Sequence, residues 1–184
     1  MQTYIALLRG INVSGHNKIK MVDLRLLFND LKFNNVTSYI QSGNVIFTSS
    51  EKDISKIERA IKEAIKKKFD YDVKVLVITK KDILTVFASN PFLENQDPDI
   101  TKLCVTFLSD FPASENALQL EEFTSTYTDE YKISEKHIYL HCPESFAKTK
   151  LTNNLIERKL KLNATSRNWK TITKLVELSN EAFE

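Results

Sequence analysis

Short apolar runs alternate with segments of helical periodicity in the first half of the chain. The run YIALL at 4–8 predicts a strand, whereas the four isoleucines between 54 and 65 recur on one helix face. A Gly-Asn pair between two further runs is typical of a tight hairpin. We therefore predict the order β-α-β-β-α-β with a trailing helix, with strands at 3–9, 36–40, 45–48 and 73–78 and helices at 21–32, 54–68 and 82–87.

The second half repeats this order of elements without repeating the residues. We predict strands at 103–108, 127–133, 137–141 and 164–166, and helices at 114–123, 151–160 and 168–178.

The segment at 89–101 carries two prolines and several acids, which predicts a linker between the halves. Right-handed crossovers would place two helices over each sheet. The predicted fold is therefore α+β, with two tandem ferredoxin-like β-α-β-β-α-β halves at 1–88 and 102–184, each followed by an extra helix.

Helix starts are marked by side chains that accept hydrogen bonds from backbone amides. The segments Ser50–Asp53 and Thr79–Asp82 are typical of capping boxes. Thr165 or Ser166 is expected to cap the last helix.

All three glycines and many hydrogen-bond donors fall between residues 8 and 44. In a β-α-β-β-α-β unit, the loop after the first strand and the hairpin after the second strand lie at the same end of the sheet. Backbone amides of a glycine-containing loop that leads into a helix bind phosphate or carboxylate oxygens. The candidate anion-binding residues of this end are Arg9, Gly10, Asn12, Gly15, Lys18, Lys20, Gln41, Ser42, Gly43 and Asn44.

A purely structural interpretation of these residues stays open. The glycines would then make turns, with Asn12 and Asn17 capping them, and the Gln41–Asn44 segment would be an ordinary hairpin tip. The loop lacks the phosphate-binding Walker pattern and the dinucleotide-binding fingerprint, so neither nucleotide class is supported.

A second group of candidates lies at one end of the second half: Lys148, Lys150, Arg167, Asn168 and Trp169. Trp169 shares a helix face with Ile172 and Val176, which favours a role in the core. Arg167 precedes a predicted helix start, where a cation is disfavoured, so a bound anion or an acid from elsewhere is expected to compensate it. Whether this group meets the first one is left open.

Charge is unevenly distributed along the chain. Residues 1–81 carry 15 Lys and Arg against 8 Asp and Glu, whereas residues 82–146 carry 3 against 12. This predicts separate basic and acidic faces, although solvated helix surfaces explain part of it.

The remaining chemistry is sparse. Cys104 and Cys142 lie in apolar runs and are expected to be reduced and buried. The three histidines show no metal-binding or triad spacing, so no metal, no cofactor and no catalytic residue is predicted. No apolar run is long enough to span a membrane, and the start of the chain lacks the features of a leader, so we expect a cytoplasmic protein.

Four segments together resemble a known bacterial family. They read LLRGINVSGHNKIKM, YIQSGNVIF, KTKLTN and ATSRNWKTITKL, and they are similar to those of the family called domain of unknown function 1697. Ser14 stands where that family usually has a second glycine, which leaves the role of this position open. The resemblance implies a duplicated ferredoxin-like α+β fold and no particular activity.

Three functional hypotheses follow from the sequence. The first is a binding module for an anionic ligand, either a phosphate-bearing metabolite or nucleic acid. The second is an enzyme that acts on a small phosphorylated or carboxylated metabolite in a cleft between the halves. The third is an interaction scaffold that dimerises through the acidic middle of the chain. Whether the protein is a monomer or a homodimer stays open.

Overall fold

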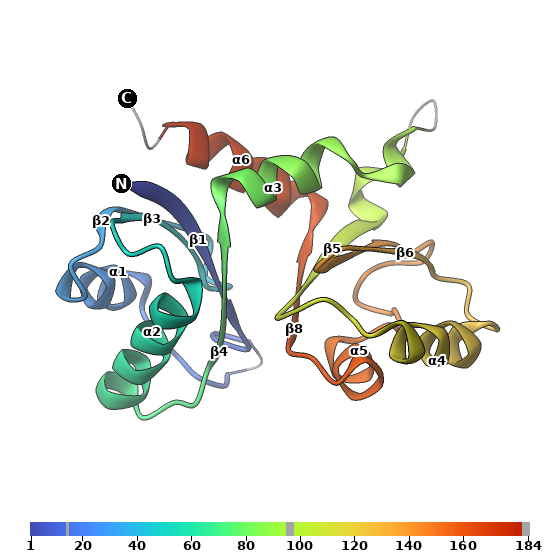
Figure 1. The fold of residues 1–184 in the computed structure, drawn as a ribbon, viewed down its shortest axis with the longest axis horizontal. Coiled ribbons are helices and arrows are strands. Elements are labelled where there is room, and N and C mark those ends of the chain that lie inside the picture. The colour runs from blue at the N-terminus through green and yellow to red at the C-terminus, as the bar shows by residue number, and fades with distance from the viewer. Residues whose placement is uncertain (14, 95–97, 182–184) are drawn as a thin grey trace. The chain divides into compact units, whose positions relative to one another are not determined.

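The computed structural model describes residues 1–13, 15–94 and 98–181. Within these residues the chain forms an α+β fold with two four-stranded antiparallel sheets and six α-helices (Figure 1). It divides into two compact units, one made of residues 1–85 and 174–184 and the other of residues 86–173. The predicted α+β class with two four-stranded sheets is thus confirmed.

The sheet of the first unit has the strand order β2-β3-β1-β4, and each neighbouring pair is antiparallel. The first unit contains β1 (Gln2–Arg9), α1 (Met21–Asp30), β2 (Asn34–Tyr39), β3 (Asn44–Ser49), α2 (Ile54–Phe69) and β4 (Lys74–Thr79). Helix α3 (Lys80–Ala88) begins in this unit, and its residues from 86 onward belong to the second unit.

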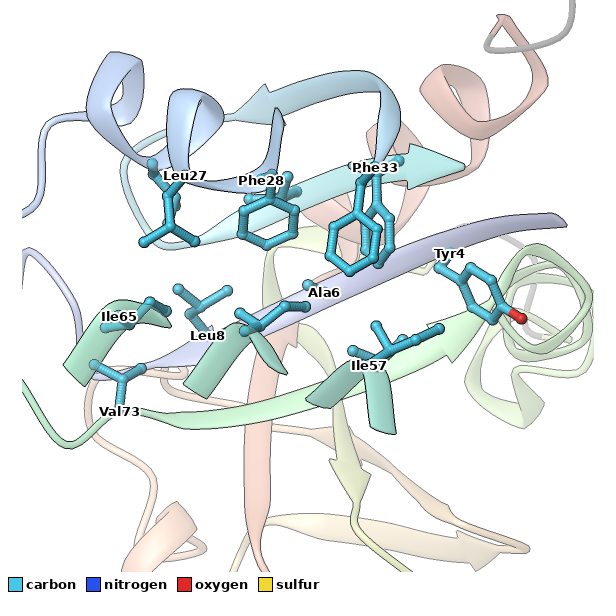
Figure 2. Close-up of a cluster of buried hydrophobic side chains, with 14 of the residues drawn as sticks. Tyr4, Ala6, Leu8, Leu27, Phe28, Phe33, Ile57, Ile65 and Val73 are labelled. Atoms are coloured by element: carbon cyan, nitrogen blue, oxygen red, sulfur yellow. The ribbon is translucent and has the colours of Figure 1, made fainter. Parts of the chain in front are cut away.

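The core of the first unit lies between one face of this sheet and helices α1 and α2. Strand β1 points alternate side chains to opposite faces, and its Tyr4, Ala6 and Leu8 belong to this core. Figure 2 shows these residues beside Phe28 of α1 and Ile57 of α2. The apolar spacing of both helices is therefore explained by burial against the sheet.

The sheet of the second unit has the corresponding order β6-β7-β5-β8, again antiparallel throughout. The second unit contains the short 3-10 helices η1 (Pro91–Leu93) and η2 (Ile100–Lys102), β5 (Leu103–Leu108), α4 (Ser114–Thr124), β6 (Glu130–Ser134), β7 (His137–His141), α5 (Asn153–Leu160) and β8 (Ala164–Asn168). Helix α6 (Trp169–Glu181) begins in this unit, and its residues from 174 onward belong to the first unit. The predicted linker at 89–101 thus contains two helical turns.

Two capping predictions have different outcomes. At Thr79–Asp82 the prediction is confirmed, because the Asp82 N–H donates to Thr79 Oγ1 over 3.1 Å and the Thr79 N–H donates to Asp82 Oδ2 over 2.8 Å. At Ser50–Asp53 it is wrong: Asp53 is the N-cap residue, and its carboxylate accepts from the N–H groups of Ser55 and Lys56. The carboxylate of Glu51 binds the amides of residues 52 and 53 instead.

The cap of α6 also differs from the expectation. Asn168 Oδ1 accepts from the Thr171 N–H over 2.8 Å, whereas Thr165 and Ser166 lie within β8. The strand is longer than predicted because residues 164–168 all pair with β5.

Both cysteines are free and buried, as predicted. Cys104 lies in β5 and Cys142 follows β7. The hydrogen bond to Cys142, together with burial, raises the pKa of the Cys104 thiol, which favours its protonated form.

Replacing Thr152 with alanine is expected to lower the free energy of unfolding by about 1 kcal/mol. Thr152 is the N-cap of α5, and its Oγ1 accepts from the Leu155 N–H over 3.2 Å. Urea denaturation measures the change. Thr152→Ser keeps the hydroxyl and serves as the control, and a loss of the same size in that variant would contradict the capping role.

Candidate functional site

The loop after β1 and the β2–β3 hairpin are joined by one side chain. Asn12 Nδ2 donates to the carbonyl oxygens of Ile19 and Gln41, each over 2.9 Å, while its Oδ1 accepts from the Ile19 N–H over 2.9 Å. Both the oxygen and the nitrogen of the Asn12 side-chain amide thus form hydrogen bonds with backbone groups. This contact places the two segments at one end of the sheet, as the topology predicted.

The loop holds its shape through further local contacts. Asn17 Nδ2 donates to the Gly10 carbonyl over 3.0 Å, and the Asn12 N–H donates to the Asn17 carbonyl over 3.2 Å. Gly10, Asn12 and Asn17 all have positive φ, which glycine and asparagine adopt most readily. Ser14 lies outside the described residues. The asparagines of the loop therefore fix the path of the backbone.

The hairpin has a buried base and a polar tip. Asn44 is fully buried, and its Nδ2 donates to the Tyr39 carbonyl over 3.2 Å and to Ser42 Oγ over 3.0 Å. The loop spans Ile40–Gly43 rather than the predicted Gln41–Asn44, because Asn44 pairs with Tyr39 in the sheet. The described contacts of Ser42, Gly43 and Asn44 thus build the hairpin.

A cavity of about 640 Å³ lies where the loop, the hairpin and the start of α1 meet. Its lining combines two lysines and two side-chain amides with apolar residues from the start of α1: Asn12, Gly15, Lys18, Ile19, Lys20, Met21, Val22 and Gln41.

The described lining residues of this cavity carry net positive charge. None of its eight described lining residues is acidic, and two are lysines. Helix α1 begins at Met21, and the side chain of its N-cap residue, Lys20, makes no capping hydrogen bond. The first amides of a helix carry partial positive charge and bind anions. Asp23 lies in the first turn of α1 but is not among the lining residues.

Arg9 does not line this cavity. It is the last residue of β1 and follows Leu8, which points into the core under α1 and α2. Because side chains alternate along a strand, Arg9 belongs to the opposite face of the sheet. The apolar lining residues Ile19, Met21 and Val22 were not predicted. They could have been predicted as lining residues, because they lie at or just before the predicted start of the helix that follows the loop.

The second group of candidates is held by local structural contacts. Lys148 pairs with Glu144 over 3.3 Å, and Lys150 Nζ lies 5.4 Å from the ring centroid of Tyr127. Trp169 is buried and stacks on Phe87 with the ring centroids 5.5 Å apart.

Arg167 lies in β8, two residues before α6 begins at Trp169, so it precedes a helix start as predicted. Its Nη1 donates to Thr165 Oγ1 and to the Ser166 carbonyl, each over 2.8 Å. Burial lowers the pKa of the Arg167 guanidinium to about 10, which leaves it charged at neutral pH.

Strand alternation puts Arg167 and Asn168, which are neighbours in β8, on opposite faces of the sheet. Ser166, on the same face as Asn168, donates its Oγ hydrogen to Asn153 Oδ1 over 2.7 Å and connects β8 to the start of α5.

Among the described residues, every helix is too short or too polar to span a membrane. Nor do the described residues contain a group of three or more His, Cys, Asp and Glu side chains placed to hold a metal ion.

Comparison with known proteins gives a family and a fold. The chain matches a solved structure described as the conserved bacterial protein SP0830 from Streptococcus pneumoniae, with a TM-score of 0.71 and 22% identity over 97% of this chain and 98% of that one. This likeness shows a shared fold. A search of the curated proteins gives no match. The family model described as protein of unknown function (DUF1697) matches residues 1–139, most of the chain. The chain therefore belongs to the DUF1697 family.

Proposed function

We propose that the first half of the chain is a binding module for an anionic ligand, held in the cavity between the loop, the hairpin and the start of α1. The observation that carries this proposal is the lining itself, in which Lys18 and Lys20 accompany the uncapped start of a helix and acidic residues are lacking among the described positions. Lysine ammonium groups and helix N-termini both stabilise phosphate and carboxylate groups.

The size and apolar part of the cavity favour a small molecule over nucleic acid. A volume of about 640 Å³ falls within the range of small-molecule sites. Met21 and Val22 add apolar surface, and Val22 is 58% exposed. The preferred ligand is therefore a metabolite that joins a phosphate or carboxylate to an apolar group. A polyanion would instead need a basic surface that extends beyond the cavity.

Thermal unfolding with a ligand panel tests the proposal. The panel comprises phosphate, sulfate, nucleotides, phosphorylated and carboxylated metabolites, and single- and double-stranded nucleic acid. A ligand at about 100 times its dissociation constant stabilises the folded chain by about 2.7 kcal/mol, which is readily measured. Absence of a shift with every member of the panel would refute the proposal.

The double variant Lys18→Ala, Lys20→Ala is expected to abolish the ligand-induced shift while leaving the stability without ligand nearly unchanged, because both lysines are near the surface. The matched control is Lys52→Ala, Lys81→Ala, which removes the same charge from exposed positions outside the cavity. It should retain the shift. Equal losses in the two double variants would indicate a general charge effect instead of a site.

We also infer that the two halves are ferredoxin-like units that arose by duplication. The identical order of strands in the two sheets supports this, with β2-β3-β1-β4 matched by β6-β7-β5-β8. The order of helices and strands along the chain is likewise the same in both halves, including the trailing helices α3 and α6.

A further inference from the structure

A second hollow lies in the other unit, along the outer edge of β6. This groove has a volume of about 860 Å³. Residues of β6 form its floor, α4 contributes Leu118 and Glu121, and η1 contributes Phe92. Phe92 lies against His141 with the ring centroids 5.8 Å apart, and His141 is the sheet partner of Glu130. Thr124 of α4 donates to the hydroxyl of Tyr131. The Tyr131 side chain therefore lies on the α4 side of the sheet, opposite to the side that carries Phe92 and His141. The groove therefore follows the strand edge, with α4 on one side and η1 on the other.

Strand β6 is the terminal strand of its sheet and pairs with β7 on its inner side. Ser134 and His137 close a two-residue turn, so this pair exchanges backbone hydrogen bonds. Bonded and non-bonded pairs alternate along an antiparallel ladder. Tyr131 and Ile133 therefore direct their backbone N–H and C=O groups outward, into the groove. A row of such groups is a template for one more strand.

Side chains at the groove would select the partner. On the α4 side, Tyr131 and Ile133 are half-buried, and Leu118 is 60% exposed. If a strand were added beside β6, every second one of its side chains would contact this apolar surface.

Charge supplies the second criterion. Among the described residues, the groove is lined by three acids, Glu121, Asp129 and Glu130, and by one cation, Lys132. A partner with basic side chains complements this excess of acid, whereas a second copy of the same edge would bring the same excess and be repelled.

We infer that this groove binds an extended, net-positive polypeptide segment of another protein, which adds to the sheet as a fifth strand beside β6. Backbone hydrogen bonds to Tyr131 and Ile133 would supply affinity, and alternating apolar and basic side chains would supply specificity. This site is separate from the proposed anion cavity and does not depend on it.

Fluorescence anisotropy with labelled peptides tests the inference on the full chain. The probe is a peptide of about eight residues, the length of a typical strand, in which valine and lysine alternate. It is expected to bind, and the matching peptide of valine and glutamate is not. Two further probes carry N-methyl groups, one on every valine amide and the other on every lysine amide. Because only one edge of a strand pairs with β6, one of these probes should lose binding and the other should retain it.

Protein variants locate the site. Glu121→Gln, Glu130→Gln is expected to weaken binding of the valine-lysine peptide by about fivefold. The matched control is Glu115→Gln, Glu122→Gln, which makes the same charge change on α4 outside the groove and should leave affinity within about twofold. Leu118→Ser should also weaken binding, whereas Ile100→Ser, at another exposed apolar residue, should not.

Several results would overturn the inference. These are no binding of the valine-lysine peptide, binding that both N-methylated probes retain or both lose, or equal losses in the two glutamate double variants. Sedimentation of the chain alone provides a last check. A dimer that Leu118→Ser dissociates would assign the groove to self-association and would also overturn the inference.

Discussion

Replacing Gly43 with alanine is expected to lower the free energy of unfolding by about 2–5 kcal/mol. Gly43 has a φ of +79°, where an added side chain is strained. An alanine Cβ would also lie 2.7 Å from Leu8 Cβ and 2.9 Å from Ile11 Cδ1. Leu8 belongs to the sheet and is fully buried, so it cannot move away from the added Cβ without disturbing the core. Chemical denaturation followed by circular dichroism measures the loss.

Gly10→Ala is the matched control for this prediction. Gly10 has a similar φ of +71°, but an added Cβ would meet no atom within 4 Å. The expected cost is therefore the backbone strain alone, about 1–2 kcal/mol. Equal costs in the two variants would show that the close approach of the hairpin to β1 does not determine the need for glycine at 43.

The hairpin is bound to β1 by backbone as well as by packing. The Leu8 N–H donates to the Gly43 carbonyl over 2.8 Å. Displacing Gly43 would therefore disturb the hydrogen bond that places the tip, including Gln41, beside the loop. If the cavity binds an anion as proposed, Gly43→Ala is expected to weaken that binding. Gly10→Ala is expected to weaken it less, because an added Cβ at residue 10 displaces no neighbouring atom.

Periodicity predicted the order of elements because burial on one face controls both helices and strands. It located β5 at Leu103–Leu108 without error. It missed element ends that are fixed by local hydrogen bonds instead of by the burial of apolar residues. The predicted strand at 127–133 begins only at Glu130, because the Tyr127 N–H donates to the Thr124 carbonyl in a turn. The helix predicted from 151 begins at Asn153, after its Thr152 cap.

The candidate site was predictable to the extent that topology controls it. The loop and the hairpin meet because of the direction of the strands, and the hydrogen bond from Asn12 to the Gln41 carbonyl joins them. The side chain of Arg9 was assigned to this end from its position in the chain alone. Counting the alternation from Leu8 would have placed it on the other face of the sheet.

The strand that contains Arg167 was predicted too short for a different reason. The residues around it, Ala164 to Asn168, have little apolar periodicity, so the predicted strand ended too early at Ser166. The pairing of Asn168 with Cys104 extends β8 through Arg167 and buries the guanidinium. Sheet pairing is a long-range contact, and a local pattern carries little information about it.

Replacing Phe47 with alanine is expected to cost about 3–5 kcal/mol of unfolding free energy. Phe47 is fully buried in β3. The centroid of its ring lies 5.8 Å from the ring centroid of Tyr4, 5.3 Å from that of Phe28 and 4.5 Å from that of Phe33. Alanine would leave a cavity among three rings that are themselves fixed by packing. Urea denaturation measures the change. Phe47→Leu keeps most of the volume and should cost about 1–2 kcal/mol; similar costs for both variants would contradict a tightly packed cluster.

The Phe47 variant also separates stability from binding. Phe47 pairs with Tyr4 in the sheet, whereas the end of the sheet at the proposed cavity is marked by the pair Leu7 and Asn44. Molecules of Phe47→Ala that remain folded should therefore bind the anionic ligand with unchanged affinity, despite a lower melting temperature. The lysine double variant should show the reverse, with normal melting and no ligand-induced shift. If Phe47→Ala also lost affinity at temperatures where it is folded, the cavity would depend on the whole core of the unit, and the loop and hairpin alone would not define the site.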